Sequence, residues 1–142
     1  MTVASDLMRS CLVVREDATV AEVVDRIDQW AVCIVVDHHD RVTGILTEHD
    51  LARLVYGSGQ LDGDSRVAGH LPAFLGMTPA QLRAVPVTEL MTPEPDSISP
   101  DTEFDEILQA IFRQHRDVLP VVKDHRLLGV VHRMDVIKKV LG

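Results

Sequence analysis

Gly44-Ile45-Leu46-Thr47-Glu48-His49-Asp50 is the stretch of the sequence that decides the fold. Its first residues are aliphatic and suit a strand, and three more aliphatic residues follow it at helical spacing. Thr47 and Asp50 stand three residues apart, which is the spacing of a helix capping box. The stretch therefore predicts a strand that runs straight into a helix, with a hydroxyl and a carboxylate at the helix N-terminus.

The same pattern returns near the C-terminus as Gly129-Val130-Val131-His132-Arg133-Met134-Asp135. The two glycines are separated by 85 residues (44 to 129), and so are the two aspartates (50 to 135). Around each copy the sequence predicts, in order, a short helix, a strand, a helix, two strands and a closing helix. Two copies indicate a pseudo-twofold pair, because a solenoid needs three or more repeats.

The segment between the repeats differs from both of them. Gly57-Ser58-Gly59 ends the first closing helix, and Thr78-Pro79 is a typical cap and first helical position for a short helix further on. We therefore divide the chain into a first motif over residues 1–57, a connector with a short helix over 58–86, and a second motif over 87–142.

The composition predicts a globular protein with an aliphatic core. Apolar residues make up 46% of the 142 residues but aromatic residues only 4%, and the net charge of −8 disfavours nucleic acid and anionic membrane surfaces as partners. No apolar run reaches the length of a membrane span, and Asp6 and Arg9 interrupt the N-terminus where a signal peptide would be apolar. We expect a cytoplasmic protein.

Motifs for catalysis or metal binding are not found in the sequence. It contains no Ser-His-Asp order, P-loop or dinucleotide glycine motif, and neither His38-His39-Asp40 nor Glu48-His49-Asp50 has a metal-binding spacing. Cys11 and Cys33 form no CxxC and lie among apolar residues, which favours reduced core cysteines over a disulfide. We expect no enzyme activity and no metal site.

The doubled order of these elements resembles the tandem cystathionine-β-synthase (CBS) domain pair, also called a Bateman module. The resemblance rests on a short helix ending in Met, on the strand Ile34-Val35-Val36-Asp37, and on the closing pattern Gly-apolar-apolar-Thr-x-x-Asp. It implies an α/β fold of two pseudo-symmetric β-α-β-β-α motifs packed sheet to sheet. It also implies a regulatory homodimer that requires no cofactor, acts on another protein and binds an adenosine-containing ligand: AMP, ADP, ATP, S-adenosylmethionine or an NAD-type dinucleotide.

The resemblance assigns roles to particular residues. Asp50 would bind the ribose hydroxyls and Thr47 the ribose or phosphate, with Asp135 as the second ribose ligand. His132 replaces the usual Thr or Ser in the second repeat, so we expect the Asp50 pocket to bind more strongly than the Asp135 pocket. Adenine would lie against apolar positions on the first two strands of each half, namely Val13, Ile34, Ile98 and Val118.

Three cationic side chains could bind a phosphate tail that enters the cleft. Arg133 follows the second junction, and His115 and Arg116 precede a strand of the second half. Each candidate has a structural alternative. The two aspartates could simply cap their helices, and the cations could belong to a solvated helix end. A protein with vestigial pockets and a purely structural, dimerising role is therefore the alternative function.

Two sets of apolar residues complete the prediction. The core is expected to contain six strand positions: Val35, Val36, Ile45, Val121, Val122 and Val130. The flanking helices carry more apolar residues than a small sheet can cover, which favours at least a dimer. The residues concerned are Leu7, Met8, Leu54, Val55, Val136, Ile137 and Val140.

Overall fold

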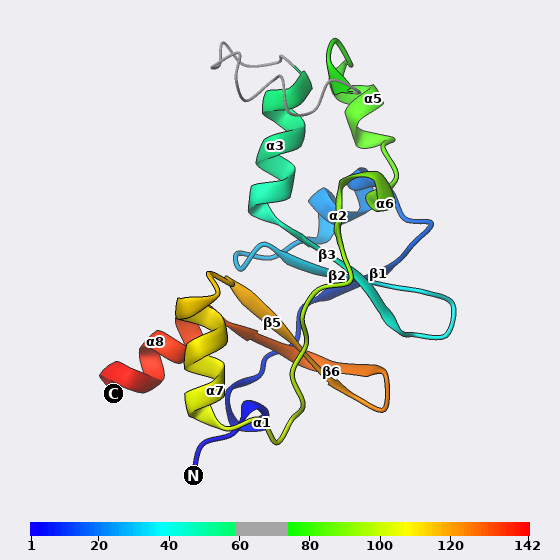
Figure 1. The fold of residues 1–142 in the computed structure, drawn as a ribbon. Helices are drawn as coiled ribbons and strands as arrows, with labels where there is room; N and C mark the ends of the chain where they lie inside the picture. The colour runs from blue at the N-terminus through cyan, green and yellow to red at the C-terminus, as the bar shows by residue number, and fades with distance from the viewer. Residues whose placement is uncertain (59–73) are drawn as a thin grey trace.

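The computed structural model describes residues 1–58 and 74–142 as two sheets packed face to face with helices outside them (Figure 1). The first sheet has the order β1-β2-β3-β4, formed by Leu12–Arg15, Val32–Val36, Val42–Thr47 and Thr92–Pro93. Strand β1 is parallel to β2, and the other neighbours are antiparallel. The predicted α/β class with two packed, pseudo-symmetric halves is confirmed.

The second sheet has fewer strands than the first. Strands β5 (Val118–Lys123) and β6 (Arg126–His132) form an antiparallel pair. Single bridges extend it on both sides, from Ile98 to Val121 and from Arg9 to Val130. The strand expected around Ile98 is thus reduced to one bridge with two backbone hydrogen bonds.

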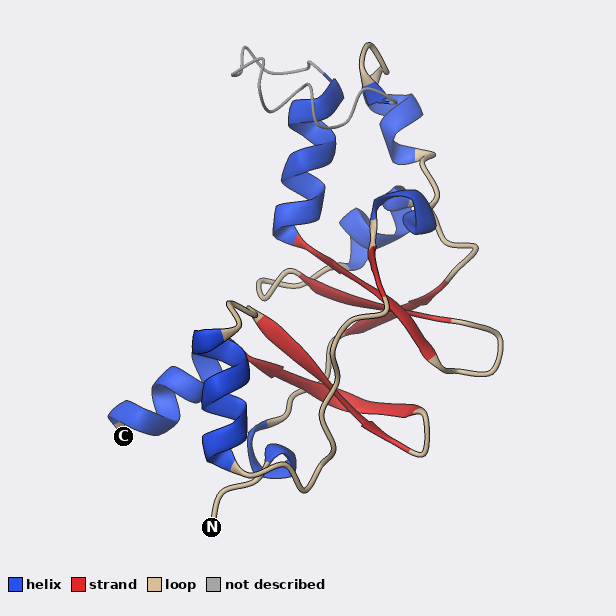
Figure 2. Cartoon of the chain, in the orientation of Figure 1, coloured by secondary structure: helices blue, strands red, loops and turns tan. Residues whose placement is uncertain are grey.

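Helices cover the outer faces of the two sheets (Figure 2). The closing helices α3 and α8 begin directly at the ends of β3 and β6, as predicted from the two decisive stretches. The second predicted helix of the second repeat divides into α7 and a π-helical segment, η2. The bounds are α2 Val20–Arg26, α3 Glu48–Ser58, α5 Pro79–Arg83, α7 Phe104–Leu108, η2 Gln109–Arg113 and α8 Arg133–Leu141.

The first helix of each repeat packs on the other half. Helix α1 (Ala4–Leu7) lies beside α7 and adds Ala4 to the core beneath the second sheet. Helix α6 (Val87–Leu90) adds Val87 and Leu90 to the core of the first half. Each core therefore contains the first helix of the other repeat. The predicted ranges 1–57, 58–86 and 87–142 follow the repeats in the sequence and do not include this exchange.

The connector contributes to the first core. Residues 59–73 lie outside the described residues. Helix α5 follows and has the predicted cap: the Thr78 hydroxyl accepts the Gln81 N–H at 3.2 Å, and Pro79 is the first helical residue. Phe74, Leu82 and Val85 are buried in the first core, so this part of the connector is packed.

An aliphatic cluster joins the two sheets. It combines three residues of β2 with Ile45, Val118 and Val130, the last two from the second half. Five of the six predicted core positions are buried, and Val122, which lies at a register shift between β5 and β6, is partly exposed. Within residues 1–58 and 74–142, no helix has the length and apolar character needed to span a membrane.

The glycines of the repeated stretch allow the exchanged segments to cross the sheets. A Cβ on Gly129 would come within 2.8 Å of the Arg9 carbonyl oxygen, whereas a Cβ on Gly44 would meet the thioether of Met91. A backbone atom held in a bridge cannot move easily, but the end of a methionine side chain can. The two glycines therefore have the same role, but a side chain should be tolerated better at position 44 than at position 129.

We predict that Gly129→Ala destabilises the protein by about 1–3 kcal/mol, the usual cost of overpacking, and that Gly44→Ala costs less. Urea unfolding followed by circular dichroism measures both variants, and the Gly44 variant is the matched control. Equal losses of stability would contradict the proposed difference between backbone and side-chain contacts.

Candidate ligand-binding site

Asp50 lies in the first turn of α3 and is buried, with 4% of its surface exposed. Its Oδ2 accepts the backbone N–H of Thr47 at 3.0 Å and the Thr47 hydroxyl at 3.3 Å. Its Oδ1 meets Arg53 at 3.5 Å, which is long for a hydrogen bond. The carboxylate thus caps the helix, as the spacing predicted, and keeps one oxygen with capacity for further donors.

A cavity of about 280 Å³ opens beside this carboxylate. The first repeat contributes Ile45, Thr47, His49 and Asp50 to it, and the second repeat contributes two segments. Those segments supply Thr92, Pro95, Asp96, His115, Arg116, Asp117 and Val118. A molecule in this cavity would therefore touch both halves at once.

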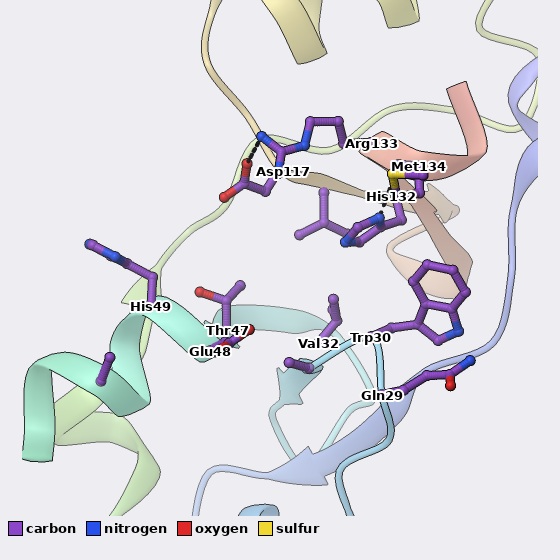
Figure 3. A pocket seen from close by; sticks show the side chains of 13 residues that line it. Gln29, Trp30, Val32, Thr47, Glu48, His49, Asp117, His132, Arg133 and Met134 are labelled. Carbon is purple, nitrogen blue, oxygen red and sulfur yellow. Dashed lines mark hydrogen bonds and ion pairs between the residues drawn. The ribbon is translucent and has the colours of Figure 1, made fainter. Parts of the chain in front are cut away.

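A larger cavity of about 570 Å³ lies between the N-termini of α3 and α8 (Figure 3). Thr47 and His49 line it from the first helix, and His132 and Arg133 from the second. Gln29, Trp30 and Val32 form another part of its wall. Since Thr47, His49 and Val118 also line the smaller cavity, the two spaces adjoin.

The second junction repeats the capping geometry with different side chains. Asp135 accepts the His132 N–H at 3.0 Å, and the His132 ring nitrogen Nδ1 accepts the Met134 N–H at 3.1 Å. Arg9 also binds Asp135 through two nitrogens, with Nε at 2.9 Å from Oδ2 and Nη2 on Oδ1. This ion pair raises the pKa of the Arg9 guanidinium. Asp135 is not among the residues that line either cavity.

The predicted site residues divide between these places. His115 and Arg116 join Thr47 and Asp50 at the smaller cavity, and His132 and Arg133 line the larger one. Of the four predicted adenine contacts, Val118 lines both cavities. Ile34 is fully buried between the sheets, Val13 is 41% exposed on β1, and Ile98 packs on the second core. Those three are not among the cavity-lining residues.

Both arginines predicted to bind phosphate are already paired with carboxylates. Arg116 contacts Asp96 at 2.5 Å and Arg133 contacts Asp117 at 3.2 Å, with about half of each side chain exposed. Exposed pairs of this kind contribute about 0–1 kcal/mol, so they can open for a stronger partner.

Arg9 and Trp30 are the residues that the sequence reasoning missed as parts of a site. The signal was present in the repeat, because Leu7-Met8 corresponds to Leu90-Met91 and therefore Arg9 to Thr92. An arginine at a position where the other repeat has threonine marks a local departure from symmetry.

The cysteines are free thiols, as predicted. Burial raises the pKa of Cys11 to about 11 and that of Cys33 to about 12, so both stay protonated and unreactive near neutral pH. Among the residues that the structure describes, no group of three or more His, Cys, Asp or Glu side chains could hold a metal ion.

Comparison with known proteins decides the family. The sequence matches the CBS domain over residues 4–57 and again over residues 87–142, once for each repeat. The chain belongs to the CBS domain family. It is a tandem CBS pair, and no curated protein matches it in a sequence search.

Solved CBS pairs share the fold over nearly the whole chain. The CBS domains of a transcriptional regulator from Streptococcus pneumoniae are 20% identical, with 97% of this chain and 98% of that chain covered and a TM-score of 0.70. CBSX2 in complex with AMP is 20% identical, with 99% and 97% covered and a TM-score of 0.71. The CBS domain pair of MJ0100, in complex with 5′-methylthioadenosine and S-adenosylmethionine, is 20% identical, with 99% and 100% covered and a TM-score of 0.70.

Acid should destabilise this CBS pair partly through His132. Burial lowers the pKa of its imidazole below 6.5, Arg9 and Arg133 act in the same direction, and Asp135 opposes them. The unfolded chain then takes up the proton at higher pH than the folded chain, so this stability is complete above about pH 6.5 and falls as the pH drops through the folded pKa. Urea unfolding at pH 7.5, 6.5 and 5.5 measures the loss.

His132→Asn keeps an acceptor for the Met134 N–H but cannot titrate, so the loss of stability in acid should become smaller. His125→Asn, in an exposed turn with positive φ that asparagine tolerates, is the matched control and should keep the wild-type dependence. If His132→Asn and wild type lose equal stability between pH 7.5 and 5.5, His132 is not the group responsible.

Proposed function

We propose that this CBS pair is a regulatory, non-catalytic module that binds an adenosine-containing ligand at Asp50. The observation that carries the proposal is a buried carboxylate at a cavity, with Oδ1 engaged by a contact of 3.5 Å. The two hydroxyls of a ribose are donors, and hydrogen bonds to an ionised carboxylate are about twice as strong as neutral ones. Asp50 is therefore suited to a vicinal diol.

The walls of the cavity suit the rest of such a ligand. Ile45 and Val118 supply apolar surface for a base, and His115 and Arg116 lie at the same cavity for a phosphate. Two solved CBS pairs with this fold support the choice of ligand, since one holds AMP and the other holds 5′-methylthioadenosine and S-adenosylmethionine.

The charges around the cavities favour ligands with little negative charge. Arg116 and Arg133 are each paired with an aspartate, and a triphosphate that opens these weak pairs would still lie beside the carboxylates of Asp96 and Asp117. A neutral or cationic adenosyl compound, or a monophosphate, meets less repulsion. We infer that AMP, 5′-methylthioadenosine and S-adenosylmethionine bind more tightly than ATP.

Ligand binding would act on the arrangement of the two halves. Asp50 and Thr47 lie on the first sheet and its closing helix, whereas Val118 begins β5 of the second sheet. A ligand that touches both favours the arrangement in which the two walls are closest, and this differential affinity is what a sensor needs. The regulated partner would read the arrangement of the halves.

Replacing Asp50 tests the proposal. Asp50→Asn keeps an oxygen for the Thr47 N–H but removes the charge that strengthens the ribose bonds, at about 1.5–3 kcal/mol for each bond to a charged group. The affinity for AMP, measured by calorimetric titration, should fall at least about tenfold. Asp135→Asn is the matched control in the second repeat and should change the affinity less.

A thermal-shift panel of AMP, ATP, S-adenosylmethionine, 5′-methylthioadenosine and NADH separates the proposal from the alternative. Stabilisation by one or more members, with ATP the weakest of the adenosyl compounds, agrees with the proposal. No shift at millimolar concentration of any of them would favour a structural protein with vestigial pockets.

We also propose that the module is a homodimer formed through exposed apolar side chains of its closing helices. Leu54 and Val136, expected at this interface, are buried within their own halves. Apolar side chains remain exposed on both helices: Val55 and Tyr56 on α3, and Met134, Val140 and Leu141 on α8. Exposed large apolar side chains on both closing helices favour a role for these helices in an interface.

Sedimentation equilibrium at micromolar concentration should show a dimer, and Val140→Glu should weaken it at least about tenfold, because a charge in an apolar interface loses its hydration. Lys139→Gln, next to it on α8, changes the net charge by the same −1 and is the control. A monomeric wild type at this concentration would contradict the dimer.

A further inference from the structure

The Asp135 junction is equivalent in position to the Asp50 junction, but its surroundings are different. Arg9 bridges to Val130 just as Thr92 pairs with Ile45, and Val130 lies 85 residues after Ile45 (45 to 130). Arg9 therefore stands in the second junction where Thr92 stands in the first. The short Thr92 side chain leaves a cavity beside Asp50, and the long Arg9 side chain reaches Asp135.

Arg9 satisfies the carboxylate in the way that a ligand would. Its Nε and Nη2 each donate to one oxygen of Asp135, a bidentate arrangement that is among the strongest hydrogen-bonding geometries in proteins. The Arg9 and Asp135 side chains are 25% and 11% exposed. By contrast, Asp50 meets Arg53 at 3.5 Å through one oxygen. Arg9 therefore occupies both oxygens of Asp135, whereas Oδ1 of Asp50 can still accept hydrogen bonds.

Trp30 completes the occupied site. Val32 pairs with Thr47 in the first repeat, and Val118 pairs with His132 in the second, so Val32 and Val118 are equivalent positions. Two residues before them stand Trp30 and Arg116, which are therefore equivalent as well. The Trp30 ring lies 3.7 Å from the Arg9 guanidinium carbon, which is a close cation–π stack, and meets the His132 ring edge-on at 5.3 Å. The pair thus supplies a flat stacked group and two donors to a carboxylate, the same features that a nucleoside presents.

We propose that Arg9 and Trp30 are a built-in occupant of the Asp135 site, so that each chain binds a single adenosyl ligand, at Asp50. This inference rests on the proposed function for the identity of the ligand, but the contacts that fill the second site do not depend on it. A free ligand at Asp135 would have to displace a side chain that is tethered by its own backbone bridge and therefore has a high effective concentration.

Exchanging residues between the two junctions tests the proposal. The double variant Arg9→Thr with Trp30→Arg gives the second junction the residues of the first, and calorimetric titration with AMP should show the number of sites rise from one to two per chain. Arg15→Thr, an exposed arginine paired with Asp40, is the matched control and should leave one site.

The reverse exchange tests the same idea without disturbing Asp135. Thr92→Arg places a guanidinium beside Asp50 and should reduce AMP affinity at least about tenfold. Thr88→Arg, on the exposed side of α6, is its control and should bind as wild type does. Thr92→Arg remains informative if the double variant fails to fold.

Trp30 is the single tryptophan of the chain and gives a second readout. In Arg9→Thr alone, AMP that enters the opened site should quench Trp30 fluorescence by stacking on the indole, whereas wild type should show little change. A wild type that binds no AMP would count against the proposed function. Two AMP sites in wild type would overturn the proposal that Arg9 and Trp30 fill the Asp135 site. A folded double variant that gains no site would also overturn it, whether or not wild type binds AMP.

Discussion

The structure depends on the crossing of each repeat's first segment over the sheet of the other repeat. The crossing needs a position without a side chain, and Gly129 and Gly44 supply it beneath Arg9 and Met91. It brings the first helices, α1 and α6, into the cores that they complete. It also delivers Thr92 to the Asp50 cavity and Arg9 to Asp135, so the same constraint that completes the fold decides what stands beside each aspartate.

The two binding junctions show how one backbone pattern supports different chemistry. Both aspartates cap a helix by accepting a backbone N–H at 3.0 Å. What differs is the side chain that the opposite half places nearby: a threonine at Asp50 and an arginine at Asp135. A duplicated fold thus keeps its geometry while a single long cation distinguishes the repeats.

Local pattern was sufficient for some of this structure. The strand-to-helix junctions, the caps at Asp50 and Thr78 and most of the aliphatic core follow from residues close together in the sequence, where propensity and spacing determine the outcome. The doubled order then gave the fold class.

The remainder depends on contacts between distant residues. Arg9 and Asp135 are 126 positions apart, and spacing within one repeat cannot reveal which half a short helix packs on. The turn into π-helix at Gln109 and the loss of a regular strand at Ile98 also depend on tertiary packing.

A single repeat is an incomplete folding unit, since its core lacks the helix that the other copy provides. Two separate copies could each be completed only by a reciprocal swap, as in a domain-swapped dimer, and joining them in one chain makes that swap intramolecular and independent of protein concentration.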